Sequence, residues 1–178
     1  MDRDQFWRLV AAARDRAADP QEGESVAREA TAMLAARSAE EIVAAQQALW
    51  DLMAESYTNP LWAAAYLLNG GCSDDGFEYF RAWLIAQGRE TFERVVADPD
   101  ALAELPVVRD AAADRVDLEA EEVLGIAWNA HLAATGEELP PEAFTIRYPP
   151  LDPAWALAFD DSAELARRLP RLAALCVD

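Results

Sequence analysis

The 178-residue sequence contains no lysine, one histidine and two cysteines. Without lysine, neither Schiff-base chemistry nor a phosphate-binding loop that depends on a lysine is available. A single imidazole cannot build a multi-histidine metal site or an HExxH motif. The two cysteines, Cys72 and Cys176, lack CxxC spacing and predict no disulfide framework. A reducing, cytoplasmic location is therefore expected.

Positive charge is also scarce, because 15 arginines face 33 acidic residues and leave a net charge of -18. Such an excess disfavours the phosphate backbone of nucleic acid and the surface of anionic membranes. No apolar run is long enough to span a bilayer, and the charged N-terminus has no signal core. We therefore expect no nucleic-acid partner and no membrane partner. Hydrophobic residues make up 53% of the chain, enough for a folded core.

The hydrophobic periodicity is helical throughout, and no stretch shows sustained alternation. We predict an all-α, single-domain helical bundle over residues 1–178, with about seven or eight helices. Two capping boxes mark helix starts, Asp2 with Gln5 and Ser38 with Glu41. The predicted helices cover residues 4–18, 24–37, 39–57, 59–68, 74–87, 89–97, 117–135 and 162–176, the last with a bend at Pro170.

Three further segments are informative. The run 61–68 has no polar face, which predicts a central buried helix that Asn59 caps. Residues 106–116 are polar and rich in alanine, and we expect a mobile connection there. Residues 139–153, near the C-terminus, are dense in proline and predict a well-fixed loop with one short extended piece at 144–148.

The segment 69–89 reads as a tight glycine turn that feeds an aromatic-rich helix. Gly70 and Gly71 suit left-handed backbone conformations, and Ser73 is placed to cap the helix that follows. Acidic side chains in a first helical turn interact favourably with the helix dipole. This turn is the place where a functional site is expected.

The same region resembles the signature of the domain of unknown function family 4240 (DUF 4240). The similarity lies in LWAAAYLLNGGCSDDGF at 61–77, YFRAWLI at 79–85 and QGR at 87–89. The opening DQFW at 4–7 and TGEELP at 135–140 are also similar to that family. The resemblance covers residues 1–140 and implies little about function, because the family is named for lacking one. The Pro-rich loop and C-terminal helix of 141–178 carry no such similarity.

Cys72 is the first candidate for chemistry, since it lies just before a helix N-terminus, where a thiolate is stabilised. A nucleophilic cysteine also needs a base, and His131 is the only imidazole. The alternative is a small buried thiol in a tight turn, with His131 as a core-edge histidine. We favour this alternative because free cysteines are commonly buried, and Asp74 and Asp75 further oppose ionisation of the thiol.

Carboxylates are the second candidate. Asp74 and Asp75 lie four and three residues before Glu78, so a pair can share one helix face. With Asn69 or Cys72 they could hold a divalent ion, but they lack the ligand spacing of an EF-hand loop. Acidic residues are in any case expected in a first helical turn. We therefore predict no metal and no cofactor, and keep the three carboxylates as weak metal candidates.

Arginines are the third candidate. Arg81 follows Glu78 by three residues and predicts an intrahelical ion pair, and Arg89 lies just after the helix. With the free N–H groups of the turn they could bind an anionic ligand. Asp74 and Asp75 instead favour a cationic or amphoteric ligand. A salt-bridge network that locks the turn is the simpler interpretation.

We predict a non-catalytic binding or regulatory module with its site near the Asn69–Asp75 turn and an unknown small ligand or protein as its partner. The alternative is an enzyme that acts on a small-molecule or peptide substrate, either through Cys72 and His131 or through the carboxylates. A third reading is that the signature specifies only the fold. The predicted ligand-binding residues are Asn69, Cys72, Asp74, Asp75, Glu78, Arg81 and Arg89.

Overall fold

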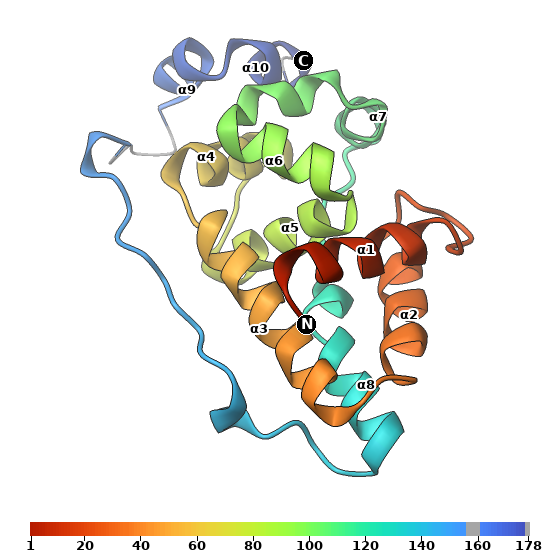
Figure 1. Ribbon diagram of the computed structural model, residues 1–178. Helices are drawn as coiled ribbons and strands as arrows, with labels where there is room; N and C mark the ends of the chain where they lie inside the picture. Colours follow the sequence, from red (N-terminus) through yellow and green to blue (C-terminus); the bar gives the residue numbers. More distant parts are fainter. Residues whose placement is uncertain (156–160, 177–178) are drawn as a thin grey trace.

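The computed structural model describes residues 1–155 and 161–176, and the regular structure in these ranges is entirely helical. This confirms the all-α prediction. One group of α-helices packs together at the end of the molecule that carries the N-terminus (Figure 1): α1 (Arg3–Arg14), α2 (Gly23–Leu34), α3 (Ala39–Glu55) and α8 (Ile126–Thr135). A second group lies at the other end: α4 (Asn59–Leu68), α6 (Arg89–Ala97), α7 (Pro106–Asp114), α9 (Ser162–Arg168) and α10 (Pro170–Cys176). The described residues also include four short 3₁₀ helices: η1 (Pro99–Glu104), η2 (Glu121–Val123), η3 (Pro141–Ala143) and η4 (Pro153–Trp155).

Both capping boxes form as predicted. Asp2 accepts from the backbone N–H of Gln5, and the Gln5 side chain accepts in return from Asp2 N–H, which starts α1. Ser38 and Glu41 make the same reciprocal pair at the start of α3. The third expected cap is wrong by one residue, because Thr58 caps α4 and Asn59 is its first helical residue. Thr58 is extended, and its hydroxyl oxygen accepts a hydrogen bond from Leu61 N–H.

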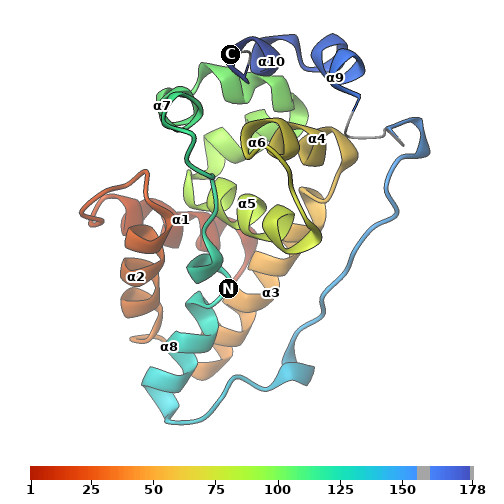
Figure 2. The ribbon, with the colours of Figure 1, turned by 180° about the vertical axis from the view of Figure 1, so that it is seen from behind.

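The helix at the centre of the molecule is α5 (Asp74–Ala86). It contacts α2 and α3 in the first group and α4 and α6 in the second, and it lies between the groups in both views (Figures 1 and 2). Residues 80–87 are all buried. In α4, by contrast, Trp62, Tyr66 and the last two leucines are only partly buried. A central position for the helix at 61–68 is therefore not confirmed.

The segment predicted as a mobile connection is α7, and that prediction is wrong. Pro106 lies in the first turn of the helix, where its missing N–H costs nothing, and the alanines that follow are strong helix formers. Val108 is fully buried and fixes α7 to the core. Arg115 then takes a left-handed conformation with φ +55° and ends the helix.

The start of α8 also differs from the sequence-based prediction, which placed it at residue 117. Residues 117–120 instead form a linker, held by hydrogen bonds from Leu118 N–H to Asn69 Oδ1 and from Ala120 N–H to the Tyr79 carbonyl. The end is as predicted, since Gly136 terminates α8 with φ +76°. Trp128, in the first turn of α8, is 37% exposed.

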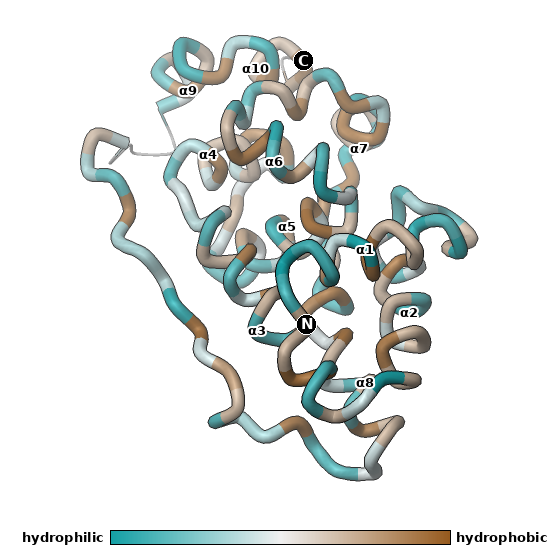
Figure 3. The backbone as a smooth tube through the Cα atoms, in the orientation of Figure 1, coloured by the Kyte–Doolittle hydropathy of each residue, from teal (hydrophilic) through white to brown (hydrophobic). Residues whose placement is uncertain are grey.

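Residues 144–152, which we call the strap, run in extended form alongside α3 toward the second group of helices (Figures 1 and 2). Among the described residues, no β-strand pairs with the strap. Gln47 of α3 instead donates to the Thr145 carbonyl at 3.2 Å and accepts from Thr145 N–H at 2.8 Å. Asn59 donates to the Asp152 carbonyl at 2.9 Å. Hydrophilic and hydrophobic residues are interspersed along the strap (Figure 3).

The last two helices are separated at Pro170, where a bend is predicted. Leu165, Leu169 and Leu172 are buried there. Arg171 ties α10 to η1, because its guanidinium pairs with the carboxylates of Asp98, Asp100 and Glu104. No helix in the described part of the chain has both the length and the hydropathy needed to cross a membrane.

Candidate functional site

A cavity of about 280 Å³ lies beside the first turns of α5, between the end of α3 and the strap. We call it the Tyr57–Tyr148 cavity. Its lining residues are Tyr57, Asp74, Asp75, Glu78, Arg81 and Tyr148. Four of these six, Asp74, Asp75, Glu78 and Arg81, are predicted ligand-binding residues. The two tyrosines are not among the predicted residues.

The acidic side of the cavity is positioned by the glycine turn. Gly70 and Gly71 have φ of +63° and +139°, which L side chains rarely adopt, so glycine is needed to reverse the chain after α4. Ser73 then accepts from Gly76 N–H at 3.1 Å and starts α5. This cap places Asp74 and Asp75 in the first turn, both exposed, where the helix dipole stabilises their charge.

The base of the cavity is Arg81, whose side chain is 1% exposed. Its Nη1 donates to the Met53 carbonyl at 2.6 Å and its Nε to the Phe77 carbonyl at 3.2 Å. The Glu78 carboxylate lies 4.0 Å from Nη2, which is the predicted intrahelical pair at its outer limit. Burial is the main reason that the pKa of Arg81 is lowered, and Glu78 opposes that shift. Arg81 is thus engaged mainly with backbone carbonyls.

Aromatic rings form the walls around Arg81. Its guanidinium carbon lies 4.7 Å from the centre of the Phe77 ring and 5.1 Å from that of Tyr57, within cation–π range. Tyr148 meets Tyr57 edge-to-face at 5.2 Å and donates its hydroxyl to Glu78 Oε2 at 2.8 Å. Partial burial, followed by this bond to Glu78, raises the pKa of Tyr148 to about 12. The strap therefore closes one side of the cavity through a tyrosine.

No motif in the sequence marks Tyr57 or Tyr148 as a residue of the site. Tyr57 lies at the end of α3 and carries no local motif, although its position just before the Thr58 cap indicates that the chain turns there. Tyr148 is 70 residues beyond Glu78 in a segment without periodicity. Only the path of the strap past α3 brings Tyr148 to the cavity.

Asn69, a predicted ligand residue, lies on the other side of the turn. Its Oδ1 accepts from Leu118 N–H at 3.1 Å, and its Nδ2 is buried without a hydrogen-bond partner among the described residues. Asn69 and Gly70 line a different cavity of about 260 Å³, together with the ends of α7 and α10. The predicted site is therefore divided between two places in the structure.

Cys72 is half-buried within the turn, and its backbone carbonyl accepts from the indole N–H of Trp62 at 3.1 Å. Burial raises the pKa of the Cys72 thiol to about 12, and the negative charge of Glu119 acts in the same direction. Arg81 opposes this shift without cancelling it. The surroundings of Cys72 thus stabilise the thiol rather than a nucleophilic thiolate.

His131 lies in α8, which packs against α2 and α3. Its Nδ1 donates to the Glu137 carbonyl at 2.9 Å, and this bond joins the last turns of α8 to the segment that follows the helix. The charged groups that act on the Cys72 thiol are Glu119, Arg81, Asp117 and Asp74. The described contacts of His131 and Cys72 do not bring the two residues together.

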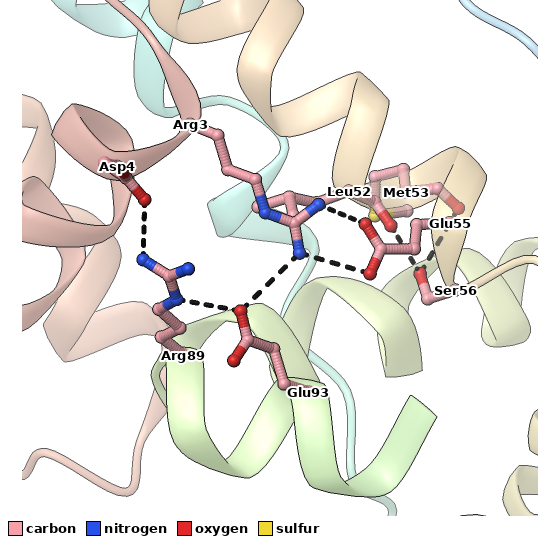
Figure 4. Close-up of polar contacts among 8 residues, drawn as sticks. All are labelled: Arg3, Asp4, Leu52, Met53, Glu55, Ser56, Arg89 and Glu93. Carbon is pink, nitrogen blue, oxygen red and sulfur yellow. Dashed lines mark hydrogen bonds and ion pairs between the residues drawn. The ribbon is translucent and has the colours of Figure 1, made fainter. Parts of the chain in front are cut away.

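Arg89 belongs to an ion-pair network at the junction of α1, α3 and α6 (Figure 4). It pairs with Asp4 at 2.6 Å and with Glu93 at 2.8 Å. Glu93 also lies 3.8 Å from Arg3, which makes a bidentate contact with Glu55. The network fixes α1 against α3 and α6, so Arg89 is engaged in packing rather than in the glycine turn.

The three carboxylates of the cavity are not arranged as a metal site. Among residues 1–155 and 161–176, no group of three or more histidine, cysteine, aspartate or glutamate side chains is placed to hold a metal ion. Asp74, Asp75 and Glu78 share the cavity with Arg81 alone as a positive charge. The cavity can therefore receive a positively charged group between carboxylates and tyrosine rings.

These observations define an all-α protein with a cavity beside its central helix, and this cavity is lined by carboxylates and tyrosines. The chain belongs to the family described as "Protein of unknown function (DUF4240)", which matches residues 1–132. No curated protein and no solved structure matches the chain significantly. The matched region contains five of the six residues that line the Tyr57–Tyr148 cavity, and Tyr148 lies beyond it.

Proposed function

We propose that this protein is a non-catalytic binding module whose Tyr57–Tyr148 cavity takes a small cationic or amphoteric ligand. The observation that carries the proposal is the composition of the cavity lining, which combines three carboxylates, two tyrosines and one arginine. The arginine is buried and already donates to two backbone carbonyls. The charge presented to a ligand is therefore negative.

The positions of the carboxylates support recognition of a cation. Asp74 and Asp75 are exposed at the rim, and neither takes part in an ion pair among the described residues. The tyrosine rings add a face that attracts cations through their quadrupole. Glu78 is less exposed and is held by Tyr148, so its orientation is fixed before a ligand arrives. An amine or guanidinium group suits this combination.

The enzyme alternative has less support. A cysteine nucleophile requires an ionised thiol and an adjacent base. The raised pKa of Cys72 works against ionisation, and His131 is bonded to its own helix terminus. The remaining route, acid–base chemistry by Asp74, Asp75 and Glu78, involves the same cavity and would be seen as turnover of a bound amine.

The test is isothermal titration calorimetry of the protein with three small cations of different shape, namely tyramine, agmatine and choline. The matched anion is 4-hydroxyphenylacetate, which has the ring of tyramine and the opposite charge. At least one cation is expected to bind, and the anion is not. Glu78→Gln is expected to weaken the binding roughly tenfold, the loss typical of a charged partner that becomes neutral.

Glu138→Gln is the control, since Glu138 is exposed and lies outside the cavity. It changes the net charge by the same amount and should leave the affinity unchanged. The proposal fails if none of the three cations binds, or if the anion binds as tightly as tyramine. It also fails if Glu138→Gln weakens binding as much as Glu78→Gln does.

We further propose that the chain acts in the cytoplasm as one unit of residues 1–178. Cys72 and Cys176 are both free, which suits a reducing compartment. The region beyond the family match packs on the rest, since α10 contacts α4, α7 and η1. A truncation after residue 140 should therefore expose apolar surface, which increased binding of a hydrophobic dye would reveal.

A further inference from the structure

A second cavity, of about 320 Å³, opens between α7 and the start of α2, and we call it the α7 cavity. Its lining comes from residues 21–23 at the start of α2, from α5, from α7 and from residues 116–119. Figure 2 shows α7 and the linker 117–120 on the face of the molecule that is seen from behind. The α7 cavity shares no lining residue with the Tyr57–Tyr148 cavity.

The inner part of the α7 cavity is apolar. Trp83 of α5 lines it and is 3% exposed, and Leu118 is also buried. Val116, just before the linker, is 58% exposed, the largest exposure among the large hydrophobic side chains described. An exposed valine next to a tryptophan-lined hollow leaves apolar surface that a partner could cover.

The rim of this cavity is acidic, and no arginine or histidine lines the cavity. Its carboxylates are Glu22, Asp110, Asp114, Asp117 and Glu119. None of the five forms an ion pair with another described residue, and the pKa of Glu119 is raised by partial burial and by Asp117. The negative charge around the apolar surface is therefore not neutralised by the lining.

One face of α7 carries both features. Val107, Asp110, Ala111 and Asp114 follow the spacing i, i+3, i+4 and i+7, which places them along one side of a helix. Asp110 and Asp114 are a like-charge pair at i, i+4, an arrangement that costs a helix some stability. A positive partner would relieve this repulsion while its apolar residues cover Val107 and Ala111.

We propose that the α7 cavity is a docking surface for a basic, amphipathic segment of a protein partner. Arginine or lysine side chains of the partner pair with the acidic rim, and its apolar side chains contact Val116 and the hollow lined by Trp83. Charge complementarity identifies the partner, since an acidic rim rejects nucleic acid and attracts a basic segment. Helix recognition through an apolar stripe in a groove supplies the binding mode.

The experiment uses three fluorescein-labelled synthetic peptides and fluorescence anisotropy at 150 mM salt. The first peptide has leucine at i, i+3, i+4 and i+7 with arginine on the other face. The second replaces leucine with serine, and the third replaces arginine with glutamate. The first peptide is expected to bind at least tenfold more tightly than either of the others, because the surface requires both charge and apolar contact.

Two variants locate the binding. The double substitution Asp110→Asn and Asp114→Asn is expected to weaken the first peptide roughly tenfold and to reduce the salt dependence of binding. Val116→Ser is expected to weaken the first peptide and to leave the affinity of the second unchanged. Neither change removes a buried group, so both variants should fold.

The matched control is Glu137→Gln with Glu138→Gln, which removes two exposed charges outside the cavity. Equal weakening by this control and by the Asp110 and Asp114 pair would show attraction to the net charge of -18 rather than a site, and would overturn the proposal. Absence of binding by the first peptide, or equal affinity for the first and second, would also overturn it.

Discussion

Arg81 connects the end of α3 to the central helix, and its replacement tests how the fold is held together. The Met53 carbonyl belongs to the last turn of α3, where carbonyls lack intrahelical partners. Arg81 Nη1 satisfies it at 2.6 Å from a side chain that is 1% exposed. Ser56 Oγ also lies 3.2 Å from this carbonyl, but its single proton is shared with the Leu52 carbonyl at 2.9 Å (Figure 4). When the guanidinium is lost, the Met53 carbonyl therefore keeps only this shared donor.

Arg81→Ala removes three contributions at once. A hydrogen bond from a charged group contributes about 1.5–3 kcal/mol, and a large-to-small change in a core costs about 2–5 kcal/mol. The cation–π contacts add roughly 0.5–2 kcal/mol. Relief from burying a cation whose nearest carboxylate is 4.0 Å away offsets part of the loss. We expect a net destabilisation of about 3–5 kcal/mol.

Arg81→Met separates volume from charge, because methionine fills most of the space and removes the cation. Its expected cost is about 1–2 kcal/mol, since the buried charge no longer has to be desolvated. Urea denaturation measures both variants, and an unchanged m value shows that the native state is as compact as before. A loss below about 1 kcal/mol for Arg81→Ala, or an equal loss for both variants, would refute this account of Arg81.

Three further predictions concern single positions. Gly23→Ala should destabilise the protein by about 1–3 kcal/mol, because the new Cβ would lie 2.3 Å from Cβ of Ala120; combining it with Ala120→Gly should restore most of the loss in the same denaturation assay. The phenol of Tyr148 should titrate near pH 12, so its contribution to folding stability is present below pH 10 and is lost as the pH rises through 12; the difference in absorbance at 295 nm between the wild type and Tyr148→Phe checks this, and a midpoint that stays near 12 in Glu78→Gln would contradict a role for that carboxylate. Alkylation of Cys72 by iodoacetamide, followed by mass spectrometry, should still accelerate above pH 10; a rate that levels off below pH 9 would show an ionised thiol and revive the nucleophile hypothesis.

The sequence by itself determined the local features of this protein. Helix starts at Ser38 and Ser73 and helix ends at Gly88 and Gly136 follow from side chains that satisfy nearby backbone groups, or from glycines that permit a positive φ. These interactions span a few residues, so they can be recognised in the chain itself. The family signature at 61–89 has the same local character and led to the family that residues 1–132 match.

Interpretation by composition failed where polarity and helix propensity disagree. The polar, alanine-rich composition of residues 106–116 favours a mobile connection, but Pro106 and Val108 decide their structure, which is helix α7. The helix α4 is apolar on all sides and yet does not lie at the centre of the molecule. The central helix is α5, although it contains the buried Arg81. A helix becomes central through the number of elements that pack on it, a property of the whole assembly.

Only the tertiary structure decided which residues share a cavity. It divided the predicted site, since Asn69 faces the linker at Leu118 whereas Asp74, Asp75 and Glu78 face Tyr57 and Tyr148. It also engaged Arg89 with Asp4, 85 residues away. The physical reason is that such contacts depend on chain paths across long sequence separations, where loop closure and packing rather than local propensity fix the partners.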